Sequence, residues 1–97
     1  IYYGDEQGFT GDGNDTDARQ TMFASQVASY NDDDLSCTNS TTAVDNYDQS
    51  HPLYQGLATL AALRKAHPAL QNGAQIERLS ESGGAGVYAF SRIDRGA

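Results

Sequence analysis

The sequence predicts an α/β unit followed by a pair of antiparallel strands. Three observations lead to this prediction: a β-favouring run at residues 1–4, a helical pattern over residues 53–66, and alternating apolar residues over 74–79 and 86–93. A strand, a long connection and a helix make a β/α unit, whereas two short strands joined by a glycine-rich turn make a hairpin. The change from helical to alternating periodicity places a candidate domain boundary at residues 68–73.

The composition limits the kinds of partner that the chain can bind. Its 97 residues make at most one small domain, and an apolar content of 38% is low for a self-sufficient globule. We therefore expect the chain to be part of a larger fold. The formal charge of −7 argues against nucleic acid, which needs a basic face, and suits a neutral substrate. No run approaches the roughly 18 consecutive apolar residues of a membrane span, so no membrane partner is expected.

Residues 1–9 combine a strand-like run with carboxylates. Residues 1–3 are apolar and β-favouring, and the run breaks at Gly4 into Asp5 and Glu6. This order is typical of a buried strand that ends in a functional loop.

A long polar segment then covers residues 5–51. Unstructured stretches beyond about 15 residues are uncommon in compact domains and are usually lids, binding loops or linkers. Within this segment Phe23, Val27 and Tyr30 are spaced for about two helical turns. We therefore expect an ordered loop, held to a core by that helix.

The clearest helical pattern covers residues 53–66. Ser50 or His51 can cap this helix at its start, and Pro68 ends it, because the residue before a proline avoids the helical region. We interpret both His51 and His67 as cap residues. The apolar stripe of the helix consists of Leu53, Leu57, Leu60, Ala61 and Leu63.

Three motifs follow one another along the chain. Residues 1–6 read I-Y-Y-G-D-E, residues 17–23 read D-A-R-Q-T-M-F, and residues 64–73 read R-K-A-H-P-A-L-Q-N-G. Together they resemble the α-amylase family of glycoside hydrolases, glycoside hydrolase family 13. In that family I-Y-Y-G-D/E-E ends the eighth barrel strand, D-x-R-x-P-M-W lies in the loop and R-x-x-x-P-A-L-x-x-G opens the C-terminal domain. Here Thr21 replaces the proline and Phe23 the tryptophan.

This resemblance implies the last β/α unit of a (β/α)8 TIM barrel, followed by the first strands of an antiparallel β domain. Residues 1–67 would be strand, loop and helix of the catalytic barrel, and residues 68–97 the start of the C-terminal domain. It also implies a retaining α-glucoside hydrolase for starch-like or malto-oligosaccharide substrates, with two carboxyl groups about 5 to 5.5 Å apart. In the family these carboxylates follow other barrel strands. We therefore name no catalytic residue and expect this chain alone to be inactive.

The resemblance singles out three candidate substrate-binding residues, Arg19, Tyr3 and Asp17. In some family members the arginine contacts sugar hydroxyls, which suits its planar donor fork, and a surface ion pair is the alternative. Tyr3 either packs in the barrel interior or contacts sugar. Asp17 belongs to the same motif as Arg19.

The carboxylates raise the question of a metal site. Residues 11–17 superficially resemble a calcium loop, but the EF-hand spacing fails at Asp17 and Phe23. Residues 32–34 are three aspartates that could supply oxygen ligands, although neighbouring acids more often cap turns or face water. We expect no cofactor in this chain, and the resemblance allows Ca2+ in the full-length enzyme.

Two further functions stay open, a related α-glucosyl transferase or isomerase and a non-catalytic acidic carbohydrate-binding module. A free-standing module should close its own core, whereas a lone β/α unit leaves its strand without neighbours, so we favour the enzyme.

The resemblance favours a secreted or periplasmic location. Cys37 is the single cysteine, which excludes an internal disulfide and leaves the compartment open.

Overall fold

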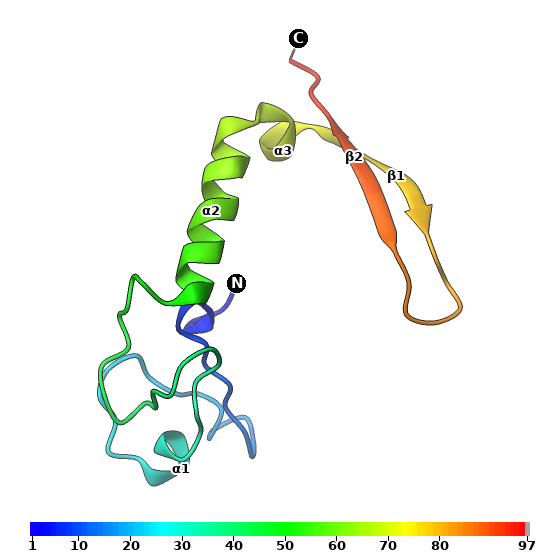
Figure 1. The fold of residues 1–97 in the computed structure, drawn as a ribbon. Helices are drawn as coiled ribbons and strands as arrows, with labels where there is room; N and C mark the ends of the chain where they lie inside the picture. The colour runs from blue at the N-terminus through cyan, green and yellow to red at the C-terminus, as the bar shows by residue number, and fades with distance from the viewer. Residues whose placement is uncertain (97) are drawn as a thin grey trace. The chain divides into compact units, whose positions relative to one another are not determined.

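The computed structural model describes residues 1–96 and is a small α+β piece with a two-stranded antiparallel sheet (Figure 1). The chain divides into two compact units, Ile1–Thr59 and a second unit from Leu60 onward. The described residues form no barrel. The elements in chain order are the 3-10 helix η1 (Asp5–Gln7), α1 (Ala28–Asn31), α2 (Pro52–Ala66), α3 (Pro68–Asn72), β1 (Ala74–Ser80) and β2 (Tyr88–Ile93).

The expected strand at residues 1–4 is not present, and this prediction was wrong. The Asp5 N–H donates to the Tyr2 carbonyl (3.1 Å), while the Asp5 carboxylate accepts from the Tyr2 N–H (2.6 Å). Gly4 has a positive φ of 91°, which turns the chain into η1. A strand needs a neighbouring strand for its backbone hydrogen bonds, and no strand within residues 1–96 lies beside this run.

The first unit is organised by buried polar side chains. Gln7 is 2% exposed, and its amide donates to the Asp48 carbonyl (2.9 Å) and accepts from the Asp48 N–H (2.9 Å). The side chain therefore supplies the same donor and acceptor pair that a neighbouring backbone would. The other buried side chains of this unit are Gln20, Met22, Leu35, Thr42, Asn46 and His51.

At Gly8, near its start, the long loop contacts a more distant part of itself at Ser36. Gly8 has a φ of 76°, its carbonyl accepts from the Ser36 N–H (2.8 Å), and a Cβ at this position would collide with the Ser36 carbonyl. Only glycine meets both conditions without strain. The loop is thus folded back on itself, as expected of an ordered loop.

The helix expected around Phe23, Val27 and Tyr30 is shorter than predicted. Only one turn forms, as α1, and residues 22–27 are not helical. The backbone of that stretch bonds elsewhere: the Ser25 N–H donates to the Thr42 carbonyl (2.8 Å), and the Met22 carbonyl accepts from the Asn46 N–H (2.8 Å). Long-range hydrogen bonds replace the helical ones here, so the apolar spacing misled the prediction.

Helix α2 confirms the predicted helix almost residue for residue. His51 precedes it, is 3% exposed, and its Nδ1 accepts from the Leu53 N–H (3.1 Å) as a helix cap. Its Nε2 lies 3.0 Å from the Ser36 carbonyl. Because Nδ1 accepts, the neutral ring carries its proton on Nε2 and donates it to Ser36. His51 therefore joins the start of α2 to the middle of the loop.

Asp48 makes the stability of the segment before α2 sensitive to acid. Hydrogen bonds from the Ser50 hydroxyl (2.6 Å) and then the Ser50 N–H (2.8 Å) lower the pKa of Asp48 from its ordinary 3.8. A lowered folded-state pKa contributes stability that is present above the unfolded-state pKa and lost as the pH falls through the folded-state value.

We expect Asp48→Ala to be less stable than the unchanged protein at neutral pH, by an amount that shrinks once the pH falls below 3.8. Urea denaturation at a series of pH values checks this expectation. Asp15→Ala is the control, because Asp15 is an exposed aspartate of the same unit. A stability difference that stays constant down to the most acid pH would contradict the prediction.

The second unit confirms the predicted antiparallel pair. β1 and β2 pair from Ala74 opposite Ile93 to Ser80 opposite Tyr88, with a register shift between Glu77 and Leu79. β2 begins two residues later than the range predicted for it. The sequence also missed α3, which begins at Pro68, where we had expected only the end of the preceding helix. The assignment of residues 1–67 and 68–97 to two domains stays a prediction.

Candidate functional site

A surface pocket of about 440 Å3 lies in the first unit, where η1 meets the segment around Arg19. It combines aromatic rings, a carboxylate, a hydroxyl, an amide and a guanidinium. Such a mixture suits a neutral ligand that has both apolar faces and hydroxyl groups. The lining residues are Tyr2, Tyr3, Asp5, Phe9, Thr10, Gly11, Ala18, Arg19 and Gln20.

Tyr3 is held at both ends of its side chain. Its ring meets Phe9 edge to face, with centroids 6.4 Å apart, and its hydroxyl accepts from the Met22 N–H (3.0 Å). The side chain is still 52% exposed. Tyr3 thus gives the pocket a fixed aromatic wall that solvent can reach.

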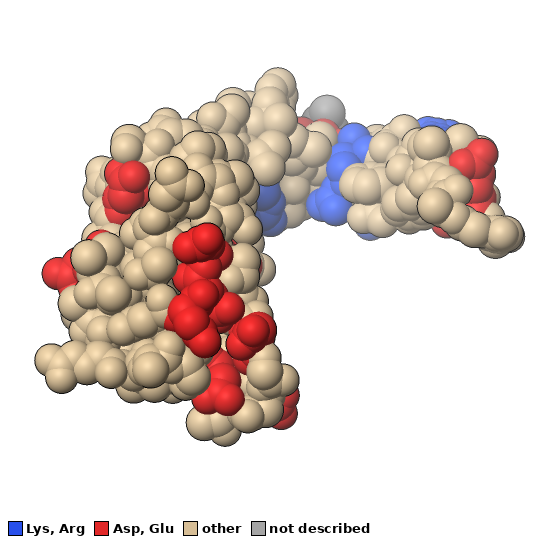
Figure 2. Space-filling view, turned by 60° about the horizontal axis from the view of Figure 1, so that its bottom comes forward, with Lys and Arg blue, Asp and Glu red and all other residues tan. Residues whose placement is uncertain are grey.

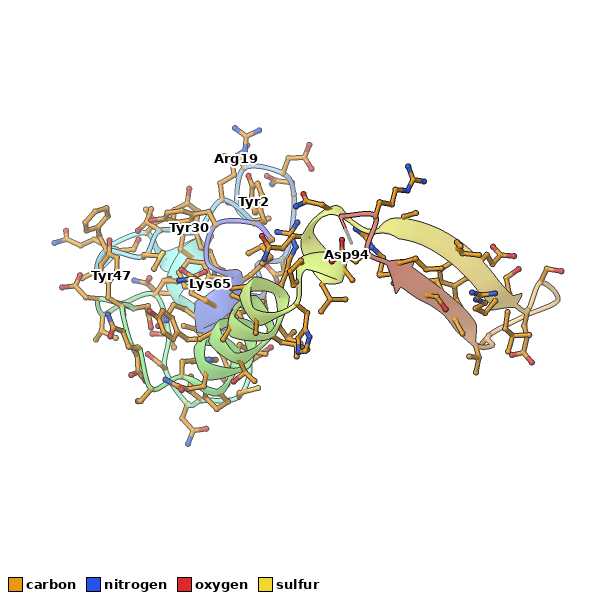
Figure 3. All side chains as sticks on the ribbon, turned by 90° about the horizontal axis from the view of Figure 1, so that it is seen from above. Tyr2, Arg19, Tyr30, Tyr47, Lys65 and Asp94 are labelled. Carbon is orange, nitrogen blue, oxygen red and sulfur yellow. The ribbon has the colours of Figure 1, made fainter. Side chains whose placement is uncertain are left out.

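Arg19 brings a positive charge to the pocket. Its N–H donates to the Thr16 carbonyl (3.2 Å), which fixes the backbone, while the side chain is exposed and extends from the ribbon beside Tyr2 (Figure 3). Residues 1–59 contain ten acidic side chains and one basic side chain, Arg19, a formal charge of −9. Arg19 and Tyr3, which the motifs predicted as substrate-binding residues, line the same pocket.

Asp17 does not line this pocket. One carboxylate oxygen accepts from the Ser29 hydroxyl (3.1 Å), and the other accepts from the Asn14 amide (2.7 Å). Asn14 in turn accepts from the N–H groups of Thr16 and Asp17 (2.8 and 3.2 Å). These bonds fix the turn that leads to Arg19.

Gln20 is a pocket residue that the sequence did not reveal. It is 5% exposed, and its amide nitrogen donates to the Tyr30 carbonyl (2.8 Å) and to the Asp33 carboxylate (3.2 Å). Since both partners are acceptors, the amide orientation is fixed and Oε1 faces away from them. Oε1 has no hydrogen-bond partner within residues 1–96. No periodicity or motif marks a lone glutamine as buried.

Carboxylates gather on one face of the first unit (Figure 2). Desolvation, followed by repulsion from Asp12, Asp32 and Asp34, raises the pKa of Asp33. Within the part of the chain that the structure describes, no group of three or more His, Cys, Asp or Glu side chains is arranged to hold a metal ion. The three neighbouring aspartates therefore do not form a ligand set here.

No helix among residues 1–96 is both long and apolar enough to cross a membrane. Cys37 is exposed and free.

Comparison with known proteins identifies the origin of the segment. The chain is 61% identical over 94 residues to an alpha-amylase of Streptomyces lividans, a match that covers 97% of this chain and 10% of that protein. The chain corresponds to a segment of an amylase-type protein. It is also 33% identical over 96 residues to a beta/alpha-amylase of Paenibacillus polymyxa, of which it covers 6%. No family model matches the chain, and no solved structure matches it.

The match confirms the amylase resemblance that the three motifs predicted. The amylase-type segment spans a tenth or less of the length of these two relatives.

Proposed function

We propose that residues 1–59 form part of the α-glucan-binding wall of a retaining amylase-type glycoside hydrolase. The observation that carries this proposal is the shared pocket of Tyr3 and Arg19, which are 16 positions apart in the sequence. The names of the two similar proteins support an α-glucan as the ligand. The acidic surroundings support a neutral ligand, because ten carboxylates would repel a polyanion.

In this proposal each pocket group has a task that follows from its chemistry. A pyranose ring has an apolar C–H face that packs on an aromatic ring, and Tyr2 and Tyr3 supply such rings. Arg19 donates to adjacent hydroxyls through its planar fork. Asp5, another lining residue, accepts from hydroxyls. Asp17 acts on the ligand through the turn that positions Arg19.

The catalytic carboxylates belong to other parts of the enzyme in this proposal. A retaining enzyme releases its first product with the anomeric configuration of the substrate. We expect the intact protein to hydrolyse soluble starch and to release α-anomeric ends, as followed by proton NMR. The purified 97-residue chain should show no turnover of a chromogenic α-maltoside above a heat-treated control.

Three results would overturn the proposal. These are β-anomeric products, no action of the intact protein on any α-glucan, or turnover by the 97-residue chain. Products longer than the donor substrate would assign the protein to the glucosyl transferases instead.

A further inference from the structure

A second aromatic surface in the first unit lies outside the pocket lining. The rings of Phe23 and Tyr47 meet edge to face, with centroids 5.7 Å apart and an interplanar angle of 68°. Phe23 is 65% exposed and Tyr47 is 52% exposed. Figure 3 places Tyr47 at a different side of the unit from Tyr2 and Arg19. We call Phe23 and Tyr47 the aromatic pair.

The backbone beneath the aromatic pair is fixed by hydrogen bonds between distant segments. The Ala24 N–H donates to the Asp45 carboxylate (2.7 Å), and the Asn46 N–H donates to the Met22 carbonyl (2.8 Å). The Thr21 hydroxyl also donates to the Phe23 carbonyl (2.8 Å). These bonds flank both rings in the sequence, so the pair is presented on a rigid support although it has little contact with a core.

Tyr3 connects the segment that carries the aromatic pair to the pocket lining. The Tyr3 hydroxyl accepts from the N–H of Met22, the residue before Phe23, and the Tyr3 ring lines the pocket. Desolvation and then the proximity of Tyr3 and Asp45 raise the pKa of Tyr47. Tyr3 therefore joins the pocket lining to the segment that carries the aromatic pair.

We propose that Phe23 and Tyr47 form an auxiliary contact surface for a neutral α-glucan chain that extends beyond the pocket. This inference rests on the proposed function for the nature of the ligand. Exposed aromatic rings on a rigid support suit a ligand with flat apolar faces. The formal charge of −9 over residues 1–59 favours an uncharged chain over any polyanion.

The test measures retardation of the intact protein in native gels that contain soluble starch. We expect Phe23→Ala and Tyr47→Ala each to raise the dissociation constant for starch, and the double variant to raise it about tenfold. Phe23→Trp and Tyr47→Phe keep the rings and should keep most of the retardation. The matched control is Tyr88→Ala, which removes a 53% exposed tyrosine from the other exposed aromatic pair, Tyr88 and Phe90.

Two results would overturn the inference. If the double alanine variant is retarded like the unchanged protein, the pair does not touch starch. If Phe23→Trp and Tyr47→Phe lose as much retardation as the alanine variants while the melting temperature drops, the pair is a packing surface. Retardation reports binding and not the configuration of the product, so an intact protein that binds starch through this pair but releases β-anomers would refute the retaining mechanism alone.

Discussion

Replacing Arg19 with alanine in the intact enzyme should lower kcat/KM for malto-oligosaccharides by roughly 10- to 150-fold, or about 1.5–3 kcal/mol. The loss follows from removing a charged donor from the wall of the pocket. Arg19→Lys should recover little, because one ammonium group cannot reproduce the fork of the guanidinium. Steady-state kinetics with a chromogenic malto-oligosaccharide measures both variants.

The matched control for Arg19 is Arg78→Ala, which removes an exposed arginine of β1 whose Nε donates to the Ser91 hydroxyl (2.9 Å). Its kcat/KM should stay within about twofold of the unchanged enzyme. A thermal melt accompanies each measurement. If both Arg19 variants keep normal kcat/KM values while their melting temperatures drop, the arginine holds the loop and does not bind substrate.

The largest effect on stability is expected at His51. His51→Ala removes the cap of α2 and the hydrogen bond to the Ser36 carbonyl, and it leaves a space where a buried ring was. We expect a loss of about 2–3 kcal/mol in the free energy of local opening at the start of α2. Hydrogen exchange of peptides that cover residues 48–56, read by mass spectrometry, measures this quantity.

Two variants separate the contributions of His51. Asparagine is a good helix cap, so His51→Asn should restore about 1 kcal/mol of the loss while leaving Ser36 without its donor. His67→Ala is the control, since His67 precedes α3 without making a side-chain cap hydrogen bond. Equal exchange in His51→Ala and His67→Ala would show that the cap at α2 contributes little.

The parts of the fold that the sequence predicted are those whose causes are local. Helix α2 and the hairpin follow from periodicity, and the cap at His51 follows from its place before the first helical residue. α3 was missed for a local reason as well. Pro68 ended one pattern, but a proline also suits the first position of a new helix, which is where it lies.

The parts that the sequence did not predict depend on distant partners. Residues 1–4 have a strand-like composition, yet a strand also needs a neighbour, and composition does not state whether one is there. Gln7 and Gln20 are buried because their amides satisfy backbone groups 41 and 10 positions away, respectively. The motifs found Tyr3 and Arg19 but not Gln20, which carries no sequence signal of its own.

The polar interior of the first unit affects how its stability responds to temperature. Only Met22 and Leu35 are buried apolar side chains there, whereas five polar side chains are buried. Exposure of apolar surface raises the heat capacity on unfolding, and exposure of polar surface lowers it. A unit held together in this way has a small heat-capacity change for its size, so its free energy of unfolding curves only weakly with temperature. Cooling should then lower the stability of this unit far less than it would lower that of an apolar core of equal size.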